Sequence, residues 1–398
     1  MERRTCLKAI GATALAAALP FGSPKRGGSH STSLFDPFGL LKADGEDRQT
    51  VGRASGSRAT IQSEVVRLTL RQTWTTTMSS SAYRDTLVVR YTRDGLTGVG
   101  EGAPIVRYLE DAAGGKQIVD GLIDLLSTAD PAMFDKLNAE ILRRVDGQWA
   151  AKAAVDIAIL DWVGQRLGVP IYRLWGLDAA DAPVTTFSIG IDTPEVTRQK
   201  VREADPFPVL KIKVGLDTDE ATIEAVRSVT KKPLRVDANE GWKTKEEALR
   251  KIRWLETQGV EFIEQPLPAA MLEEQRWLRE RVDMPIFADE SCLRPADIPK
   301  LADAYDGVNI KIDKAGGLLQ GYRMIQIARA LGLKTMLGCM VSSSVSVTAA
   351  AHLSPLVDYA DLDGNLLIGN DPYEGVTVRN GKLVLPDRPG LGVRPVRG

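Results

Sequence analysis

Histidine is almost absent from this chain of 398 residues, since only His30 and His352 occur. If the protein performs acid/base chemistry, we therefore expect lysine, carboxylate or tyrosine side chains to carry it. Cysteine is also scarce: Cys6, Cys292 and Cys339 are too few for a disulfide framework and lack the spacing of metal ligands. The composition thus argues against a disulfide-based scaffold and against a cysteine-bound metal.

An excess of charge of one sign is missing too, because 51 basic residues stand against 52 acidic ones. This balance gives no reason to expect a nucleic acid or an acidic membrane as a partner. The apolar run of residues 9–21 is shorter than the roughly 20 residues that a spanning helix needs, so no stable membrane anchor is expected. The length permits a large core, since α/β barrels of about 250 residues form single domains.

The first 57 residues have the composition of a signal peptide followed by a tether. Arg3 and Arg4 precede the apolar run, which ends in small residues, and RRTCLK resembles a twin-arginine signal. Such signals export folded proteins, so we expect an exported, periplasmic protein. Cys6 lies before the run, which does not fit a lipoprotein anchor. The alternative is a helical N-terminal tail on a cytoplasmic protein. Residues 23–57, rich in Gly, Ser and charge, are typical of a disordered tether.

Residues 58–175 have the pattern of an α+β domain. Alternating apolar and β-branched residues from 59 to 99 predict an antiparallel meander with a turn at Asp94 and Gly95. WAAKAAVDIAILDWVGQRLG, residues 149–168, has apolar residues at helical spacing and ends in glycine, with a proline just beyond it. We therefore expect a long helix there.

Residues 176–365 contain eight β-rich runs, each followed by a polar, helical-looking segment. The runs are VTTFSIG, VLKIKVG, LRVDAN, EFIEQP, IFADES, VNIKIDK, KTMLGCM and YADLDG, and they recur about every 25 residues. Serial βα units predict a parallel sheet, and eight of them indicate a closed barrel. A doubly wound open sheet is the alternative, but the first run lacks its Gly-rich phosphate turn. KAGGLLQG, residues 314–321, is only a weak signal for an anion site.

Charged residues follow the ends of these runs in register with the barrel period. They are Lys211 and Lys213, then Asp237, Glu264, Asp289 and Lys311, and finally Asp361 and Asp363. Taken singly, an aspartate there is usually a turn former or helix cap, and alternate lysines usually mark a solvated face. The C-terminal ends of all eight strands of a barrel open onto one mouth, however, so the residues of this set are expected to converge on one site.

The residue types of this set define a chemistry. Three oxygen ligands without histidine or cysteine, Asp237, Glu264 and Asp289, suit a hard cation, and we expect one Mg²⁺ per subunit. Near such a cation a substrate carboxylate can lose its α-proton to give an enediolate. Lysine serves as the base only if its pKa falls, and we expect Lys211 to lower the pKa of Lys213 and to bind the substrate carboxylate. Lys311, four strands further round, would serve the opposite face, which permits a 1,1-proton transfer.

The sequence resembles the enolase superfamily, muconate-lactonizing-type subgroup, and most closely the dipeptide epimerases, which include L-Ala-D/L-Glu epimerases. The match runs from about residue 60 to the C-terminus through GVGEGAP, AAVDIAILDWVGQRLGVPIYRLWG, LKIKVG, RVDANEGW, FIEQPL, FADES, NIKIDKAGG, DLDG and LPDRPGLGV. The resemblance implies a (β/α)8 barrel with an α+β capping domain, 58–175, to which a C-terminal segment, 366–398, returns. The cap and this segment would cover the barrel mouth and exclude water.

The resemblance also implies a role for each residue of the set. Its implied metal ligands are Asp237, Glu264 and Asp289, its acid/base groups are Lys213 and Lys311, its binders of the dipeptide ammonium are Asp361 and Asp363, and Thr186 lines the site. In Ala-Glu epimerases an arginine in the loop between the first two strands pairs with the substrate glutamate. Here Met78 and Ser79 stand at that place, with Arg71 and Arg84 on either side as substitutes. Ala-Glu specificity is therefore open.

We expect an exported epimerase that acts on dipeptides, such as peptidoglycan fragments, and forms a homo-oligomer. N-acylamino acid racemisation, o-succinylbenzoate synthesis and muconate cycloisomerisation are alternatives on the same site, but their substrates lack the ammonium group that Asp361 and Asp363 would bind. A binding or scaffold protein on a barrel without catalysis is a further alternative. It need not retain all three metal ligands and both lysines, and this chain retains every one.

Overall fold

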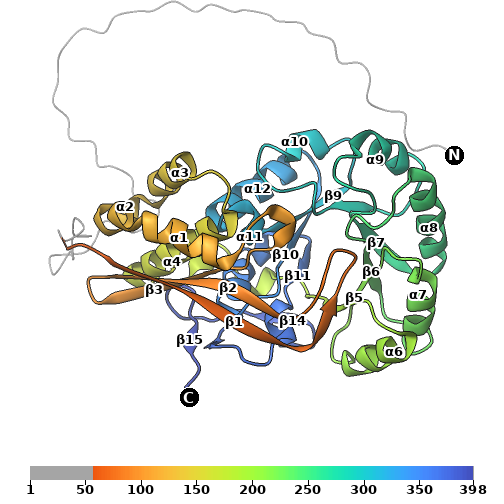
Figure 1. Cartoon of the computed structure of the whole chain (residues 1–398), viewed down its shortest axis with the longest axis horizontal. Coiled ribbons are helices and arrows are strands. Elements are labelled where there is room, and N and C mark those ends of the chain that lie inside the picture. The colour runs from red at the N-terminus through yellow and green to blue at the C-terminus, as the bar shows by residue number, and fades with distance from the viewer. Residues whose placement is uncertain (1–56, 398) are drawn as a thin grey trace, which may run out of the picture. The chain divides into compact units, whose positions relative to one another are not determined.

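The computed structural model describes residues 57–397, and its first part is an antiparallel sheet (Figure 1). Strands β1 (Thr60–Thr75), β2 (Ser80–Arg93) and β3 (Leu96–Gly102) pair in that order. Asp94 and Gly95 join β2 to β3 with positive φ angles of 51° and 77°, the conformation of a two-residue hairpin turn. The predicted meander is thus present. The predicted signal peptide and tether fall almost wholly outside the described residues.

Helices follow this sheet in the chain. They are α1 (Ala112–Gly121), α2 (Ile123–Thr128), α3 (Phe134–Arg144), α4 (Trp149–Leu167) and α5 (Ile171–Leu174). Of these, α1, α2 and α4 pack against the strands of the sheet, and α3 and α5 pack against α4. The predicted long helix is α4, and Gly168 ends it in the left-handed conformation with φ 70°.

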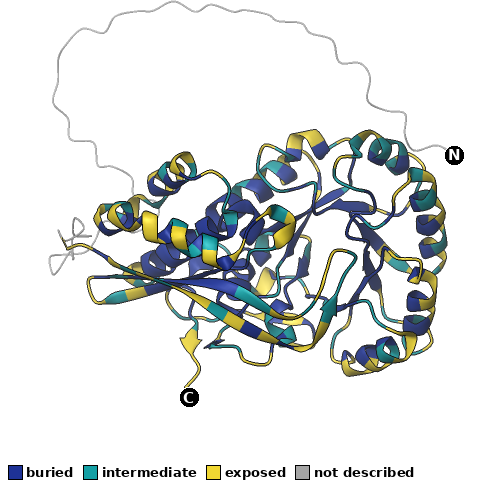
Figure 2. Cartoon of the chain, in the orientation of Figure 1, coloured by how far each residue is buried: buried dark blue, intermediate teal, exposed yellow. Residues whose placement is uncertain are grey.

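The sequence GVGEG in β3 explains how α4 lies so close to the sheet. A Cβ atom on Gly98 or Gly100 would stand 2.0 Å from a carbonyl oxygen of α4, that of Ala158 or Ala154. Only glycine permits this approach of two backbones. The contact holds α4, which is buried along most of its length, between the sheet and the barrel (Figure 2).

The barrel consists of eight parallel strands in sequential order. They are β4 (Phe187–Ile189), β5 (Leu210–Lys213), β6 (Leu234–Asp237), β7 (Val260–Glu264), β8 (Ile286–Ala288), β9 (Gly307–Lys311), β10 (Lys334–Gly338) and β11 (Tyr359–Asp361). A parallel bridge between Thr185 and Ala360 brings the first strand to the last. The eight runs of the sequence are these eight strands, so the open doubly wound sheet is excluded.

Helices between the strands form the outer layer of the barrel (Figure 1). They are α6 (Pro194–Glu203), α7 (Asp219–Arg227), α8 (Lys245–Thr257), α9 (Leu272–Arg279), α10 (Ile298–Leu301), α11 (Ile312–Ala315), α12 (Leu318–Ala330) and α13 (Ser344–Ala351). The glycine pair that could have held an anion serves packing instead. A Cβ on Gly317 would meet the Asp156 side chain at 2.3 Å, and the Asp156 carboxylate accepts the Leu319 N–H at the start of α12.

The C-terminal segment runs back toward the N-terminal sheet. Its strands are β12 (Tyr373–Glu374), β13 (Thr377–Arg379), β14 (Lys382–Val384) and β15 (Arg394–Pro395). The short 3-10 helices within residues 57–397 are η1 (Val106–Tyr108), η2 (Pro131–Met133), η3 (Ala179–Asp181), η4 (Ser354–Leu356) and η5 (Gly364–Leu367). Ile368 bridges Leu70 of β1. The segment therefore contacts the capping sheet, as expected, while the domain boundaries themselves stay predictions. Every helix within residues 57–397 is too short or too polar to span a bilayer.

Candidate active site

Pairing of the central strands places the predicted charged residues at one level. In the parallel register, Lys213 stands opposite Asp237, and Asp237 stands opposite Glu264. Each of these three residues is the last of its strand, so the side chains gather at the C-terminal mouth of the barrel. Lys211 and Lys213 are only 2% and 7% exposed. The solvated face that alternate lysines usually mark is therefore not their explanation.

Asp237, Glu264 and Asp289 form a compact acidic cluster. Each offers a carboxylate oxygen, and the three oxygens lie within 4.8 Å of one another. All three residues are buried, and the ammonium of Lys211 lies 2.8 Å from Glu264 Oε2. Three carboxylates buried this close together repel one another unless cations lie among them. The cluster therefore fits a divalent, oxygen-preferring metal ion.

Lysines neutralise these carboxylates. Lys211 Nζ lies 2.6 Å from Asp361 Oδ2 and 3.2 Å from Asp237 Oδ2, and Lys213 Nζ lies 2.5 Å from the same Asp237 oxygen. Burial alone would lower the pKa of Lys211, but the charges of Asp361, Glu264 and Asp237 raise it well above its ordinary value. Lys211 is thus held as a cation. Its predicted effect on Lys213 stays a prediction.

A second group of lysines surrounds Asp289 from the other side. Lys311 Nζ lies 2.7 Å from Asp289 Oδ2, and Lys314 Nζ lies 2.5 Å from Asp289 Oδ1. Burial alone would raise the pKa of Asp289, but the charges of Lys311 and Lys314 lower it far below its usual range. Burial would likewise lower the pKa of Lys311, yet Asp289 and Glu264 raise it above the ordinary value. Asp289 is therefore ionised and Lys311 protonated in this arrangement.

Lys213 and Lys311 lie on opposite sides of the barrel. They end β5 and β9, which are four strands apart in a ring of eight. Both line a cavity of about 630 Å³ between the barrel mouth and the capping elements. A volume of this size suits a small-molecule ligand. Two amines on opposed walls of one cavity can reach the two faces of a single bound carbon atom.

Asp361 and Asp363 lie at the end of β11 and line the same cavity. Asp361 accepts hydrogen bonds from Lys211 and from Thr186 Oγ1. Thr186 directly precedes β4 and is fully buried behind Asp361, so it supports the site and does not line the cavity. Asp363 accepts the Ser188 backbone N–H at 2.6 Å. Burial, together with the charge of Asp361, raises the pKa of Asp363 to about 7. The pair offers acidic oxygens to a positively charged group in the cavity.

Ser188 and Lys314 contact the predicted acidic residues but escaped the analysis of the sequence. Ser188 anchors Asp363 through its backbone, which no residue pattern could indicate. Lys314 belongs to the glycine-containing stretch 314–321, and its ammonium donates to the backbone oxygen of Asp289 at 2.6 Å as well as to its carboxylate. The spacing of three residues from Lys311, one turn of α11, was the available signal for Lys314.

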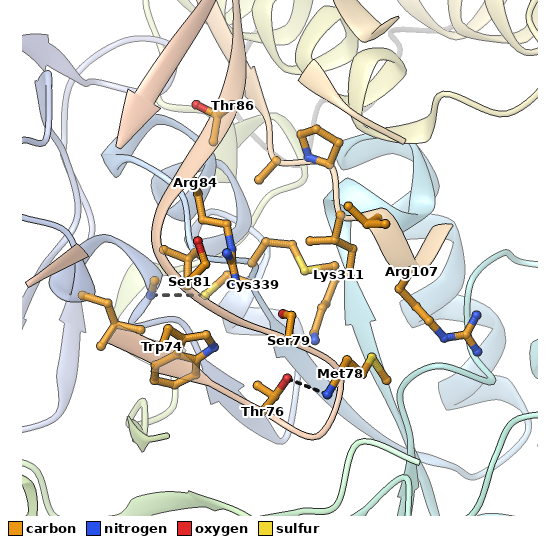
Figure 3. A pocket seen from close by; sticks show the side chains of 18 of the residues that line it. Trp74, Thr76, Met78, Ser79, Ser81, Arg84, Thr86, Arg107, Lys311 and Cys339 are labelled. Carbon is orange, nitrogen blue, oxygen red and sulfur yellow. Dashed lines mark hydrogen bonds between the residues drawn. The ribbon is translucent and has the colours of Figure 1, made fainter. Parts of the chain in front are cut away.

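The capping elements supply the other wall of the cavity. Its apolar lining includes Trp74, Met78, Ile105, Tyr108 and Leu367, and Figure 3 shows Trp74 and Met78 beside the loop between β1 and β2. This loop touches the barrel, because Thr77 Oγ1 donates to the Asn239 backbone oxygen at 2.7 Å. The expected cover over the barrel mouth is therefore present.

A second contact between cap and barrel is a bidentate ion pair. The Arg107 guanidinium donates to both carboxylate oxygens of Glu240, at 2.9 and 3.0 Å. Bidentate geometry of this kind is stronger and more directional than a single charged contact. The η1 turn is thereby fixed to the loop that follows β6.

The two arginines that flank the β1–β2 loop have different positions. Arg84 lines the main cavity. Arg71 instead lines a neighbouring cavity of about 120 Å³. Of the two substitutes that the sequence offered for the missing loop arginine, only Arg84 therefore faces the candidate site.

Comparisons with known proteins match this architecture. Residues 58–176 match the family model for the mandelate racemase / muconate lactonizing enzyme N-terminal domain, and residues 195–397 match the enolase C-terminal domain-like model. Together these models cover the capping elements and the barrel.

Curated relatives and solved structures agree with the family models. L-Ala-D/L-Glu epimerase of Bacteroides thetaiotaomicron is 42% identical over 83% of this chain and 86% of its own length. L-Ala-D/L-amino acid epimerase of Pedosphaera parvula is 43% identical over 82% of this chain and 97% of its own. The dipeptide epimerase of Enterococcus faecalis V583, solved with Mg and L-Leu-L-Tyr, has a TM-score of 0.79 at 31% identity and covers 85% of this chain and 99% of its own.

These relatives are epimerases, that is, isomerases, the class that the sequence predicts for this chain. The predicted barrel with its cap is confirmed by the strand order and by the matching structures. On the strength of both family models and of these identities, the chain belongs to the enolase superfamily, in the group of mandelate racemase and muconate lactonizing enzyme.

Proposed function

We propose that the protein is a Mg²⁺-dependent dipeptide epimerase that inverts the α-carbon of the C-terminal residue by a 1,1-proton transfer. One observation carries the proposal. Lys213 and Lys311 stand on opposed strands of a single cavity, and the acidic pair Asp361 and Asp363 lies in the same cavity. The names of the relatives, which act on dipeptides, support it.

The lysines carry the proton through the reaction. One amine, in its neutral form, takes the α-proton, and the electron pair of the C–H bond moves into the carboxylate to give an enediolate. The ammonium of the other lysine then donates its proton to the opposite face, and a new C–H bond forms with inverted configuration. Because the lysines face each other, each serves as base for one configuration and as acid for the other.

Asp237, Glu264 and Asp289 would hold one Mg²⁺ per subunit, which supplies positive charge next to the substrate carboxylate. The mutual distances and the oxygen-only donor set support this assignment, as does the Mg in the matching E. faecalis structure. Lys211, held as a cation by Asp361 and Glu264, adds a second positive charge for the same carboxylate.

Asp361 and Asp363 would bind the ammonium of the dipeptide. An N-acylated substrate lacks this charge, so it would leave the buried Asp363, which pairs with no lysine among the described ion pairs, without a cation, and this is costly. Free dipeptides are therefore favoured over N-acylamino acids, and over the substrates of o-succinylbenzoate synthesis and muconate cycloisomerisation. The wall of capping residues excludes water from the carbanion.

The test is ¹H NMR of the purified protein with Mg²⁺ and a dipeptide library in D₂O. We expect loss of the α-proton signal of the C-terminal residue and appearance of the other diastereomer. Epimerisation should be abolished by EDTA and by either Lys213→Ala or Lys311→Ala, whereas Lys334→Ala serves as matched control. Lys334 is exposed at the start of β10 and pairs with Asp358 at 3.0 Å, away from the cavity. Exchange in no dipeptide, with exchange in N-acylamino acids, would replace this proposal by an N-acylamino acid racemase.

A further inference from the structure

The three carboxylates of the acidic cluster share a pattern of hydrogen bonds. One oxygen of each carboxylate accepts a hydrogen bond from a group that the fold holds in place, and the other oxygen lies beside a lysine of the cavity. In Asp237, Oδ1 accepts the backbone N–H of Asn239 at 2.9 Å, whereas Oδ2 lies 2.5 Å from Lys213 Nζ. Because the donor to Oδ1 belongs to the main chain, the Asp237 carboxylate is held with Oδ2 turned toward the cluster.

Glu264 is held in the same way by Asn309 of β9. Asn309 Nδ2 donates to Glu264 Oε1 at 2.6 Å, and Glu264 Oε2 lies 2.8 Å from Lys211 Nζ. An ionised carboxylate only accepts hydrogen bonds, so the Asn309 amide presents its NH₂ group to it. Gly338, on the neighbouring strand β10, leaves room for this amide, because a Cβ at Gly338 would stand 2.5 Å from Asn309 Oδ1. Both strands are thus built around the contact between Asn309 and Glu264.

Lys314 holds Asp289 with all three donors of its ammonium group. They go to Asp289 Oδ1 at 2.5 Å, to the Asp289 backbone oxygen at 2.6 Å and to the Asn309 backbone oxygen at 3.4 Å. Lys314 is buried and, unlike Lys311, is not among the described residues that line the large cavity. Lys311 Nζ lies 2.7 Å from the other oxygen, Asp289 Oδ2. Asp289 therefore has one oxygen tied to the interior and one on the cavity side.

We propose that Lys314 and Asn309 are positioning residues of the metal site: they occupy the second oxygen of Asp289 and of Glu264, so that each carboxylate offers one oxygen to the cation. The backbone N–H does the same for the third carboxylate. This inference rests on the proposed Mg²⁺ site. Three single oxygens fill half of the octahedral shell that Mg²⁺ demands and leave the other half for water and for the substrate carboxylate.

A limit on the number of protein oxygens favours Mg²⁺ over Ca²⁺. Mg²⁺ takes a near-octahedral shell at short distances, whereas Ca²⁺ accepts more ligands and also carboxylates that bind through both oxygens. Without Lys314 or Asn309, the carboxylate that each one holds can turn and offer both oxygens, which suits Ca²⁺ better than Mg²⁺.

The positive charge of Lys314 acts differently from its positioning. A charge so close to the cluster weakens the binding of both divalent cations, because it repels them alike. A change in the ratio of the Mg²⁺ and Ca²⁺ affinities therefore reports positioning, and an equal change in both affinities reports charge.

The experiment is calorimetric titration of the purified full chain with Mg²⁺ alone and with Ca²⁺ alone, in the absence of substrate. We expect the wild type to bind Mg²⁺ at least as tightly as Ca²⁺. Lys314→Met keeps the length of the side chain without its ammonium, and it should lower the ratio of Mg²⁺ to Ca²⁺ affinity by about tenfold to 100-fold, the usual cost of losing a group that orients a metal ligand. Asn309→Leu changes no charge and should lower both this ratio and the Mg²⁺ affinity itself.

Lys152→Met is the matched control. It removes another buried ammonium group, which lies over the ring of Trp149 in α4 at 3.8 Å from the ring centre. This variant should keep the wild-type ratio. An equally large fall of the ratio in Lys152→Met would show a general effect of buried charge and overturn the proposal.

Other results also decide between the proposal and its alternatives. Tighter binding of Ca²⁺ than of Mg²⁺ by the wild type would refute the limit on oxygens without any variant. An unchanged ratio in Lys314→Met and Asn309→Leu would refute the positioning role while leaving the Mg²⁺ site standing. Binding of neither cation by the wild type would refute the proposed Mg²⁺-dependent function, and the positioning role with it.

Melting curves extend the comparison to a variant that is too unstable for calorimetry. A cation that binds only the folded protein raises the melting temperature according to its affinity. In the wild type, Mg²⁺ should therefore raise the melting temperature at least as much as the same concentration of Ca²⁺. In Lys314→Met and Asn309→Leu, Ca²⁺ should give the larger rise, and a larger rise with Mg²⁺ would contradict the proposal.

Discussion

Asp363→Asn tests the assignment of the ammonium site more cleanly than a change at Asp361. Asp361 also neutralises Lys211 at 2.6 Å, so its loss would disturb the lysine that is proposed to bind the substrate carboxylate. Asp363 contacts no lysine among the described ion pairs, and its hydrogen bonds come from Ser188, whose backbone N–H donates to it at 2.6 Å. Asparagine keeps the shape and an oxygen for that N–H, so the substitution removes chiefly one negative charge.

The size of the effect follows from the buried position of Asp363. A hydrogen bond between charged groups contributes about 1.5–3 kcal/mol, which corresponds to roughly tenfold to 150-fold in kcat/KM. Asp361 remains as second acceptor, so the lower half of this range is expected. The assay is kcat/KM for the best dipeptide, beside the inhibition constant of its N-acetylated analogue, which carries no ammonium. We expect the first to fall at least tenfold and the second to change less than about threefold.

The pH profile supplies an independent readout. With a pKa of about 7, Asp363 is protonated below neutral pH and negatively charged above it. Binding of an ammonium group requires the charged form, so KM for a free dipeptide should fall as pH rises through 7. Asp363→Asn has nothing to titrate there and should lose this dependence. An equal effect of the substitution on the dipeptide and on its N-acetylated analogue would refute the reasoning.

Two further predictions concern the stability of the scaffold. His352 is buried; its Nε2 is hydrogen-bonded to the Leu391 oxygen, its Nδ1 has no partner among residues 57–397, and burial lowers its pKa from 6.5 to about 4. The neutral imidazole therefore contributes to the free energy of unfolding above pH 6.5, and this contribution is lost as the pH falls from 6.5 to 4. Between pH 7 and pH 4, the free energy of unfolding in urea should fall by about 3 kcal/mol more in the wild type than in His352→Gln. Gly100→Ala, whose Cβ would meet Ala154 O at 2.0 Å, should lower the free energy of unfolding by about 2 kcal/mol or more, whereas Gly121→Ala, with open space around it, should not.

The barrel and the charged residues of the site were predictable because these residues recur along the sequence with the same spacing as the strands. Each of Lys213, Asp237, Glu264 and Lys311 is the last residue of its strand, so one regular spacing reveals both the strand and the functional end. Burial of Lys211 and Lys213 then explains why two like charges stand on one strand face, since three carboxylates neutralise Lys211.

The capping wall was not predictable in the same way, because its residues carry no periodic signal. The pairing of β1 with β2 shifts register between Thr69 and Trp74, so alternation along β1 does not tell on which face Arg71 lies. Only the structure separates it from Arg84. Contacts such as Thr77 with Asn239 join residues 162 positions apart and follow from the assembled fold. The predicted signal peptide lies outside the described residues. Export, the homo-oligomer and the peptidoglycan substrate therefore stay predictions.

The division of the cavity between barrel and cap has a consequence for specificity. Every group assigned to proton transfer or metal binding belongs to a barrel strand or directly follows one, whereas Trp74, Met78 and Arg84 belong to the cap. Strand ends are fixed by pairing with both neighbours, but a residue beside the β1–β2 loop can change without moving Lys213 or Lys311. Such a division allows related proteins to act on different dipeptides, as the names of the L-Ala-D/L-Glu epimerase and of the structure with L-Leu-L-Tyr show. A substitution on the cap wall should therefore change the substrate preference while the two lysines keep their roles, which is the behaviour expected of specificity residues and not of catalytic ones.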